Sequence, residues 1–432
     1  MRIAYITAGA AGRYCGACKR DVGLTRALIE RGHNMLLLPL YTPLQTDEPD
    51  PSLDRVFFGA LNVYLQQQCS IFRRTPRSVD WLLDRPSLLR FVSGLGVETE
   101  AEELGEMTVS VLRGSEGMQR KELDKLLDFL EDEGPFDVVN LSNSLFSGFA
   151  APIGERLGAP VVCNLQGEEG FVRHLPEEYR EEAHELLRRH ASEITVFVAS
   201  YEAYADEMAD FLDVPREKVK IVRPGLETSR YAGDRELDPE VFRVGYLSSI
   251  NPRKGIDLLF DAFARLVEEH VGDAGPREDL AVGGQLLKSN EEFWEGLKAD
   301  LGEKELGERL DYAGEMEMAE KVHFLKRCDV FCVPGRSAER NGMAWIEAVS
   351  AGVPLVVTDR PGLREIVDLT GGGVVVLPDD PAALADALAT LRDDPDRADR
   401  LGRAAAQGAA EHFDIGETAG ETLAIYESLA VD

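Results

Sequence analysis

Residues 333–359, with the sequence VPGRSAERNGMAWIEAVSAGVPLVVTD, are the most informative segment of this chain. An apolar strand ends near Pro334, and a polar loop follows it. A helix is predicted to begin around Gly342 and to end before Gly352, and the apolar stretch 354–359 predicts a second strand. A strand, a loop, a helix and a strand in this order are typical of parallel α/β construction.

The same alternation occurs in both halves of the chain. Near the start, the strand 2–9 is followed by the helix 21–32 and the strand 34–41. Further on, the strand 243–250 leads through a glycine-containing turn into the helix 256–270. The other apolar stretches that predict strands are 137–141, 160–165, 194–200, 219–223, 280–284, 329–334 and 373–378.

These strands fall into two groups, which the polar and helix-poor segment 225–240 separates. We therefore predict an α/β protein with two doubly wound, Rossmann-like domains that face a cleft. The predicted domains are residues 1–237 and 238–410, and residues 411–432 are expected to form a helix that packs back on the N-terminal domain. Ligands of open parallel sheets bind beyond the C-terminal ends of the strands, so the binding site is expected there.

The composition excludes several classes of protein. The 432 residues include 47 Lys and Arg against 78 Asp and Glu, which gives a formal net charge of −31. Because nucleic-acid binding relies on clustered Lys and Arg, this balance argues against a nucleic-acid partner. Apolar residues make up 44% of the chain and charged residues 29%, as in ordinary globular proteins and unlike disordered ones.

Targeting signals and cysteines point to one compartment. The apolar runs fall far short of the roughly 20 residues that a membrane-spanning helix needs, and the start lacks the pattern of a signal peptide. Six cysteines are few for this length, which fits a reducing compartment. We therefore expect a cytoplasmic protein. The pair Cys15 and Cys18 has C-x-x-C spacing, but no second pair with matching spacing suggests a zinc site.

Two carboxylates flank the start of the predicted helix in residues 333–359. Glu339 lies in the loop before the helix, and Glu347 lies in its first two turns. The unpaired N–H groups and the dipole at a helix N-terminus suit a phosphate, and Gly342 permits its close approach to the backbone. Both carboxylates could then accept hydrogen bonds from sugar hydroxyls. For one Glu taken alone, we favour the simpler interpretation that Glu347 caps the helix or faces solvent.

Glu339 and Glu347 are separated by seven residues and followed by AVSAGVPLVVTD, and together they resemble the E-x7-E signature of family 4 retaining glycosyltransferases. The resemblance covers nearly the whole chain and is closest in the C-terminal half. It continues through residues 15–41, 242–263, 361–367 and 371–381. The family has the GT-B fold, in which two Rossmann-like domains face a cleft.

The resemblance implies a binding site for a nucleoside-diphosphate sugar of the UDP or GDP type. Glu339 would contact the donor sugar, and Glu347 would bind the ribose hydroxyls. The backbone at Gly342 and Met343 would face the diphosphate. The residues assigned to donor binding in this way are Gly16, Arg253, Lys254, Glu339, Asn341, Gly342, Met343 and Glu347.

The resemblance also implies how the leaving group is activated. Negative charge builds on the diphosphate as the glycosidic bond breaks, and preorganised cations and N–H dipoles stabilise it. Lys254 would neutralise the diphosphate oxygens, while Gly16 would approach them from the N-terminal domain. We assign Glu339, Lys254 and Gln166 to catalysis, with no metal and no cofactor. Because no side-chain nucleophile is apparent, we favour a front-face mechanism in which the leaving phosphate helps to deprotonate the acceptor.

The chain departs from the family pattern at three positions. Ser249 stands where the family usually has an arginine, and Cys15 stands at the first glycine of the N-terminal glycine loop. Gln166 replaces the usual cleft histidine, and losing one such donor typically slows catalysis by about 10²–10³. The neighbouring carboxylates Glu168 and Glu169 could take over this role, although we favour exposed loop charges.

The expected function is the transfer of a hexose-type sugar to an acceptor hydroxyl on a glycan, a lipid or a small molecule, with retention of configuration. Two alternatives stay open: a nucleotide-sugar-binding protein without turnover, and a nucleotide-sugar epimerase on the same fold. The segment 72–92 combines arginines with aromatic residues and could touch an anionic acceptor or a membrane surface. We favour an acceptor-side or plain surface element over a membrane contact.

Overall fold

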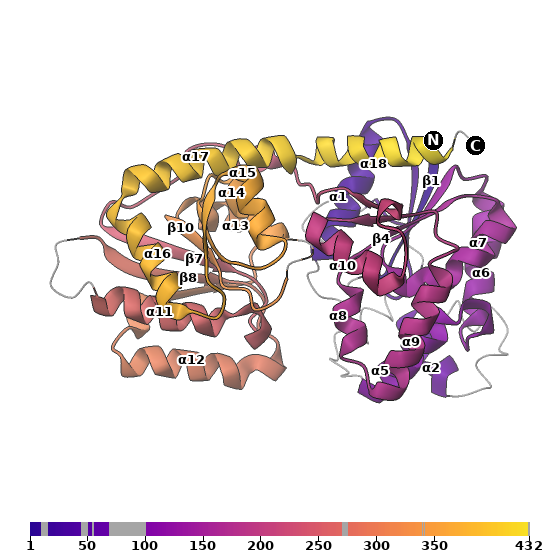
Figure 1. The fold of residues 1–432 in the computed structure, drawn as a ribbon, viewed down its shortest axis with the longest axis horizontal. Helices are drawn as coiled ribbons and strands as arrows, with labels where there is room; N and C mark the ends of the chain where they lie inside the picture. The colour runs from indigo at the N-terminus through magenta and orange to yellow at the C-terminus, as the bar shows by residue number, and fades with distance from the viewer. Residues whose placement is uncertain are drawn as a thin grey trace. The chain divides into compact units, whose positions relative to one another are not determined.

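The chain forms two compact units, each with its own parallel sheet. The computed structural model describes residues 1–9, 16–44, 51–53, 56–68, 101–269, 275–338, 340 and 342–430. The first unit comprises Met1–Arg223 and Thr418–Asp432, and the second comprises Pro224–Glu417. Each unit holds a six-stranded sheet flanked by helices (Figure 1). The predicted α/β fold with two doubly wound, Rossmann-like sheets is confirmed.

The sheet of the first unit has the strand order β2-β1-β3-β4-β5-β6, and all its pairings are parallel. Strand β1 is buried from Ile3 to Thr7, because strands lie on both sides of it and helices cover the sheet. The strands are β1 (Arg2–Thr7), β2 (Asn34–Pro39), β3 (Val138–Leu141), β4 (Val161–Asn164), β5 (Val196–Ala199) and β6 (Val219–Ile221).

Nine α-helices accompany this sheet in the part of the chain that the structure describes. They are α1 (Gly16–Glu30), α2 (Ala60–Gln68), α5 (Ala101–Leu112), α6 (Arg120–Glu133), α7 (Ala150–Leu157), α8 (Glu168–Arg173), α9 (Glu177–His190), α10 (Glu202–Leu212) and α18 (Ile415–Leu429). Helix α1 begins earlier than its predicted start at residue 21. The helix ends at Glu30 and is followed by a left-handed glycine, Gly32, after which the His33 N–H donates to the Leu28 carbonyl at 3.1 Å.

Most of helix α18 belongs to the first unit, although it comes last in the sequence. The Tyr426 hydroxyl donates a buried hydrogen bond of 3.0 Å to Asn140 Oδ1 in β3. The Thr418 hydroxyl donates to the Arg223 carbonyl at 3.0 Å. These contacts attach helix α18 to the interior strand β3 and to the segment that follows the edge strand β6. Local sequence patterns do not single out the side chains that make them.

The sheet of the second unit has the order β12-β11-β10-β7-β8-β9, again with parallel pairings only. The strand order reverses at β7, whose neighbours are β8 on one side and β10 on the other. Such a switch point is where open α/β sheets bind ligands. The strands are β7 (Val241–Leu247), β8 (Arg277–Gly283), β9 (Leu310–Gly314), β10 (Val330–Val333), β11 (Leu355–Thr358) and β12 (Gly373–Val376).

Helices cover both faces of this second sheet. Figure 1 shows α11 and α12 on one side and α14, α15 and α17 on the other, as right-handed crossovers in opposite directions from β7 require. The helices are α11 (Ile256–Glu269), α12 (Glu291–Glu303), α13 (Met318–Lys326), α14 (Met343–Ser350), α15 (Leu363–Thr370), α16 (Pro381–Asp393) and α17 (Pro395–His412). Helix α11 presents Ile256, Leu259, Phe263 and Leu266 to the core at helical spacing, and all four are fully buried.

The chain passes into the second unit after Arg223, which is earlier than the predicted boundary at residue 237. The segment that looked like a polar linker carries Tyr231, which is buried and donates a hydrogen bond of 3.0 Å to Glu347 Oε1 in α14. This contact gives residues 224–237 a place in the second unit.

One strand was not predicted from the sequence. Strand β9 lies at the edge of the second sheet, and none of its five residues is fully buried. Its short, half-polar sequence therefore lacks the apolar run by which the other strands were recognised. The described residues include no helix that is long and apolar enough to cross a membrane. Residues 72–92 lie outside the described residues.

Candidate functional site

The loops after β7 and β10 meet at the C-terminal edge of the second sheet. Gly255 ends the first of these loops with a φ of +73°, and a Cβ at this position would lie 1.9 Å from the Pro334 carbonyl oxygen. Only glycine allows this approach of one backbone to the other. The pocket at this edge is lined by Tyr246, Leu247, Ser248, Arg253, Lys254, Phe331, Cys332, Val333, Gly335, Ser337, Trp345 and Leu363.

Two predicted donor-site residues, Arg253 and Lys254, line this pocket. They lie in a short 3-10 helix, Pro252–Lys254, which follows the extended residue Asn251. The Asn251 amide nitrogen donates to the Ser249 hydroxyl at 2.9 Å, so Ser249 helps to fix the turn. Arg253 is exposed and Lys254 is half-buried. Both cations are therefore held at the strand edge where a ligand is expected.

The N-terminus of α14 opens at the same edge. Gly342 is the N-cap with a left-handed φ of +67°, and its carbonyl accepts from the N–H groups of Trp345 and Ile346 at 3.1 and 3.0 Å. Met343 is the first residue of the helix, which agrees with the predicted start around Gly342. The first N–H groups of a helix have no partner within it, so this end of α14 can receive an anion.

Glu347 lies on the buried side of α14 and not in solvent. Its Oε1 accepts a hydrogen bond from the Tyr231 hydroxyl at 3.0 Å and lies 3.3 Å from the ammonium nitrogen of Lys321 in α13. The side chains of Lys321 and Glu347 are 5% and 3% exposed. The interpretation of Glu347 as a solvent-facing residue is therefore wrong, and the carboxylate is oriented by two residues that sequence reasoning missed.

Three residues of the predicted donor loops cannot be placed. Glu339, Asn341 and Cys15 lie outside the described residues. Gly16 is the first residue of α1, after β1 of the first unit. The roles assigned to these residues therefore stay predictions.

Gln166 follows β4 at the C-terminal edge of the first sheet. Its side-chain nitrogen donates to the Ser142 carbonyl, which follows the neighbouring strand β3. Its backbone N–H donates to Glu168 Oε2 at 2.7 Å, and the Ser144 N–H donates to Glu168 Oε1 at 2.7 Å. Glu168 thus ties together the loops after β3 and β4.

Glu168 and Glu169 are buried, at 4% and 1% exposure, so the expectation of exposed loop charges is wrong. The Tyr204 hydroxyl of α10 lies 3.2 Å from a carboxylate oxygen of each. Burial raises the pKa of Glu168, although the hydrogen bonds from Gln166 and Ser144 oppose the shift. The physical reason for burial is that backbone N–H groups of two loops take the place of water around the Glu168 carboxylate.

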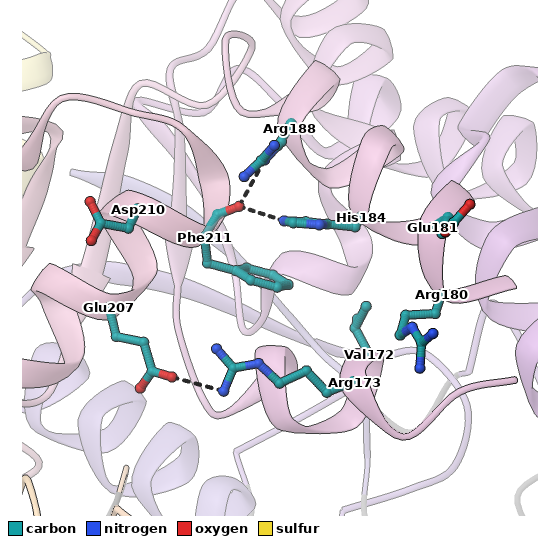
Figure 2. Close-up of a pocket in the computed structure, with 9 residues that line it drawn as sticks. All are labelled: Val172, Arg173, Arg180, Glu181, His184, Arg188, Glu207, Asp210 and Phe211. Carbon is teal, nitrogen blue, oxygen red and sulfur yellow. Dashed lines mark hydrogen bonds and ion pairs between the residues drawn. The ribbon is translucent and has the colours of Figure 1, made fainter. Parts of the chain in front are cut away.

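A second pocket, of about 510 Å³, lies between α8, α9 and α10 of the first unit (Figure 2). His184 Nε2 and Arg188 Nε both lie within hydrogen-bond distance of the Phe211 carbonyl, at 2.7 and 3.1 Å. They satisfy a carbonyl at the end of α10 that has no partner within the helix. Arg173 pairs with Glu207 at 3.1 Å. These contacts join α8 and α9 to α10, and none of the residues belongs to the predicted site.

The four cysteines that the structure describes, Cys18, Cys163, Cys328 and Cys332, are all buried. Within the described ranges, no group of three or more His, Cys, Asp or Glu side chains could hold a metal ion. Cys18 is buried in α1. Burial also raises the pKa of the Cys163 thiol and raises that of Cys328 to about 12, which keeps both in the unreactive thiol form at neutral pH.

Comparison with known families accounts for most of the chain. The family described as glycosyl transferases group 1 matches residues 230–408. The family described as glycosyl transferase 4-like domain matches residues 22–225. The two matches fall on the second and the first unit, so that both halves carry the family pattern.

Curated relatives resemble the chain over different lengths. The D-inositol 3-phosphate glycosyltransferase 1 of Catenulispora acidiphila is 26% identical over 403 residues, which cover 86% of this chain and 91% of that protein. The lipopolysaccharide core biosynthesis mannosyltransferase LpsB of Rhizobium meliloti is 30% identical over 243 residues, which cover 52% of this chain and 65% of that protein.

Solved structures share the fold at low identity. Anabaena Alr3699/HepE in complex with UDP has a TM-score of 0.67 at 16% identity and covers 99% of this chain and 100% of that one. Sucrose-phosphate synthase from Thermosynechococcus elongatus has a TM-score of 0.72 at 16% identity, with 99% of each chain covered. Both have the two-domain fold that the sequence predicts.

Proposed function

Because the chain belongs to the group 1, family 4 glycosyltransferases of GT-B fold, we propose that it transfers a hexose-type sugar from a nucleoside-diphosphate sugar to an acceptor hydroxyl, with retention of configuration. The observation that carries the proposal is the pocket at the switch point of the second sheet. There Arg253 and Lys254 lie beside the Trp345 end of helix α14.

The arrangement suits the stabilisation of a diphosphate leaving group. As the bond to the sugar breaks, negative charge develops on the phosphate oxygens, and Lys254 together with the first N–H groups of α14 would stabilise it. The turn that carries Lys254 and the N-terminus of α14 are both parts of the folded backbone, so little reorganisation is needed. By resemblance to the family, Gly16 is assigned to the same diphosphate, Asn341 to donor binding and Glu339 to the donor sugar.

Glu347 is proposed to accept hydrogen bonds from the ribose of the donor. Its carboxylate is held by Tyr231 and Lys321 and so has a fixed orientation in the first two turns of α14. The donor is proposed to be of the UDP or GDP type. A UDP donor is supported by the structural neighbour from Anabaena, which was solved with UDP and with UDP-glucose.

The acceptor is proposed to be a hydroxyl of a glycan or an inositol-type polyol. This class is suggested by the names of relatives, which include inositol phosphate glycosyltransferases and a mannosyltransferase of the lipopolysaccharide core. Gln166, which is assigned to catalysis, is proposed to donate a hydrogen bond to the sugar. Its amide nitrogen already donates to the Ser142 carbonyl, which favours binding of nucleotide sugar without turnover as the second candidate.

The proposal is tested by nucleotide binding and by turnover. Thermal shifts with UDP, GDP and ADP would be measured for the wild type, for Lys254→Ala and for Lys304→Ala, a matched control at the end of α12. A ligand at about 100 times its Kd should stabilise the protein by about 2.7 kcal/mol. We expect one nucleotide to stabilise the wild type and the control, and Lys254→Ala to lose most of this effect.

Turnover with UDP-glucose and GDP-mannose then separates the candidates. Release of nucleotide together with an α-configured product, determined by NMR, supports a retaining transferase. Conversion of the donor to its epimer without an acceptor supports the epimerase, and binding without either product supports the binding protein. If no nucleotide shifts the wild type, the proposed function is wrong.

A further inference from the structure

Arg336, in the loop after β10, reaches across to the loop after β7. Its guanidinium donates to both carboxylate oxygens of Asp257, at 2.5 and 2.6 Å, in a two-pronged ion pair. The same guanidinium donates to the Pro252 carbonyl at 2.8 Å. Pro252 begins the short helix that carries Lys254, and Asp257 lies in the first turn of α11 directly after it. Arg336 therefore contacts both ends of residues 252–257, the turn that carries Lys254.

A close backbone contact also joins this turn to the loop after β10. Between the two contacts lies Gly255, which packs against the Pro334 carbonyl so closely that no side chain would fit. Arg336 also lies 3.7 Å from Asp379, which follows β12 and pairs with Arg360 at 2.5 Å. The loops after β7, β10, β11 and β12 are thus joined by one set of charges at the edge where the donor is proposed to bind.

The ion pair contributes little to the stability of the fold. The side chains of Arg336 and Asp257 are 34% and 29% exposed, and water screens the attraction of partly exposed pairs. The pair instead fixes the position of the Lys254 turn relative to the loop of Arg336, because a planar guanidinium donates both hydrogen bonds only to a carboxylate in a narrow range of orientations. It also places the positive charge of Arg336 beside Asp257, whose carboxylate would otherwise repel a diphosphate bound near Lys254.

We propose that Arg336 is the positioning residue of the donor diphosphate site. It holds the turn of Lys254 in the orientation that binds phosphate and neutralises Asp257 at the same time. This inference rests on the proposed function, since it assigns Arg336 to the nucleotide-sugar site of the second unit. It adds a residue to which neither the sequence pattern nor the family resemblance assigns a role.

The test compares four variants with the wild type. Arg336→Met removes the hydrogen bonds to Pro252 and Asp257, and Arg336→Lys keeps the positive charge without the two-pronged hydrogen bond. Arg336→Met combined with Asp257→Asn removes both charges. Gly255→Ala separates the two loops without changing any charge. The matched control is Arg364→Met, because Arg364 makes the same two-pronged contact with Asp359, at 2.7 Å twice, on α15.

Two measurements are made on each protein. Hydrogen exchange of the amides of residues 250–257, without ligand, reports whether the turn is held. Calorimetry with UDP and GDP gives the Kd. We expect Arg336→Met and Gly255→Ala to speed exchange in this turn and to raise the Kd at least about tenfold, equivalent to 1.4 kcal/mol. The Arg336→Lys and double variants should recover part of the affinity, and Arg364→Met should match the wild type.

The outcomes separate this inference from the proposed function. If Arg336→Met binds nucleotide as tightly as the wild type, Arg336 has no positioning role, whatever happens to the exchange rates. An equal loss of affinity in Arg364→Met would also overturn the inference, because the effect would then be general to surface ion pairs. Failure of the wild type itself to bind UDP and GDP would overturn the proposed function and the role of Arg336 with it.

Discussion

The pair of Lys321 and Glu347 gives a prediction that can be worked out from the structure. The two side chains approach to 3.3 Å, and both are almost completely buried. Changing Lys321 to Met keeps the length and the apolar stem of the side chain and removes the ammonium group. The Glu347 carboxylate then stays in an environment with little water while losing its cationic partner.

Breaking a buried ion pair by removing one partner destabilises a protein by about 3–5 kcal/mol, because the remaining charge is poorly solvated. Removing both charges is much less harmful, since the desolvation penalty disappears together with the attraction. We therefore expect Lys321→Met to lower the free energy of unfolding of the second unit by about 3–5 kcal/mol. Adding Glu347→Gln to this variant should recover more than half of the loss.

Urea denaturation followed by tryptophan fluorescence measures this effect. Trp294 and Trp345 both lie in the second unit, whereas the third tryptophan of the chain, Trp81, falls in the range of the first. All variants are therefore made with Trp81→Phe, so that the emission reports the unfolding of the second unit. With a slope of about 1–3 kcal/mol per molar urea, the midpoint should fall by about 1 M or more at unchanged slope. A loss below about 1 kcal/mol, or a double variant as unstable as Lys321→Met, would refute the reasoning that an ion pair orients Glu347.

The first unit offers two further predictions. Tyr426→Phe removes the buried hydrogen bond to Asn140 and should cost about 1–2 kcal/mol, with faster amide exchange in α18; unchanged exchange there would contradict this anchoring role. Glu168 has a raised pKa in the folded state, so the folded protein binds this proton more tightly than the unfolded chain does. The free energy of unfolding therefore falls as the pH rises above the ordinary pKa of a Glu carboxyl. The free energy of unfolding of Glu168→Gln, measured by urea titration, should therefore rise relative to that of the wild type as the pH increases from 4.5 to neutrality. A difference between the two proteins that does not change with pH would contradict this role of the carboxyl.

Much of the site in the second unit could be predicted because its determinants are local. Gly342 marks the start of α14, since its left-handed φ suits glycine and the helical pattern follows directly. Arg253 and Lys254 lie in the turn after a strongly apolar strand, and parallel strands bring such turns to one edge of the sheet. The spacing of Glu339 and Glu347 led to the family, and the family matches confirm it.

The partners of these residues could not be predicted, because they come from distant parts of the chain. Tyr231 looked like part of a polar linker, and nothing in the sequence near Lys321 indicates a buried cation. Glu168 and Glu169 look like exposed loop charges in the sequence. In the structure, backbone N–H groups of the loops after β3 and β4 donate hydrogen bonds to Glu168. Each case depends on which backbone or side-chain groups replace water around a charge.

Local patterns of apolar residues, glycines and helix ends thus specify the two α/β sheets and place Lys254 at the edge of one of them, because strand and helix formation depends on neighbours in the sequence. The orientation of Glu347 and the ion pair of Arg336 with Asp257 arise only in the folded chain. A charged side chain is stable in the interior or at a loop junction only when a partner of suitable geometry reaches it, and folding alone brings that partner within reach.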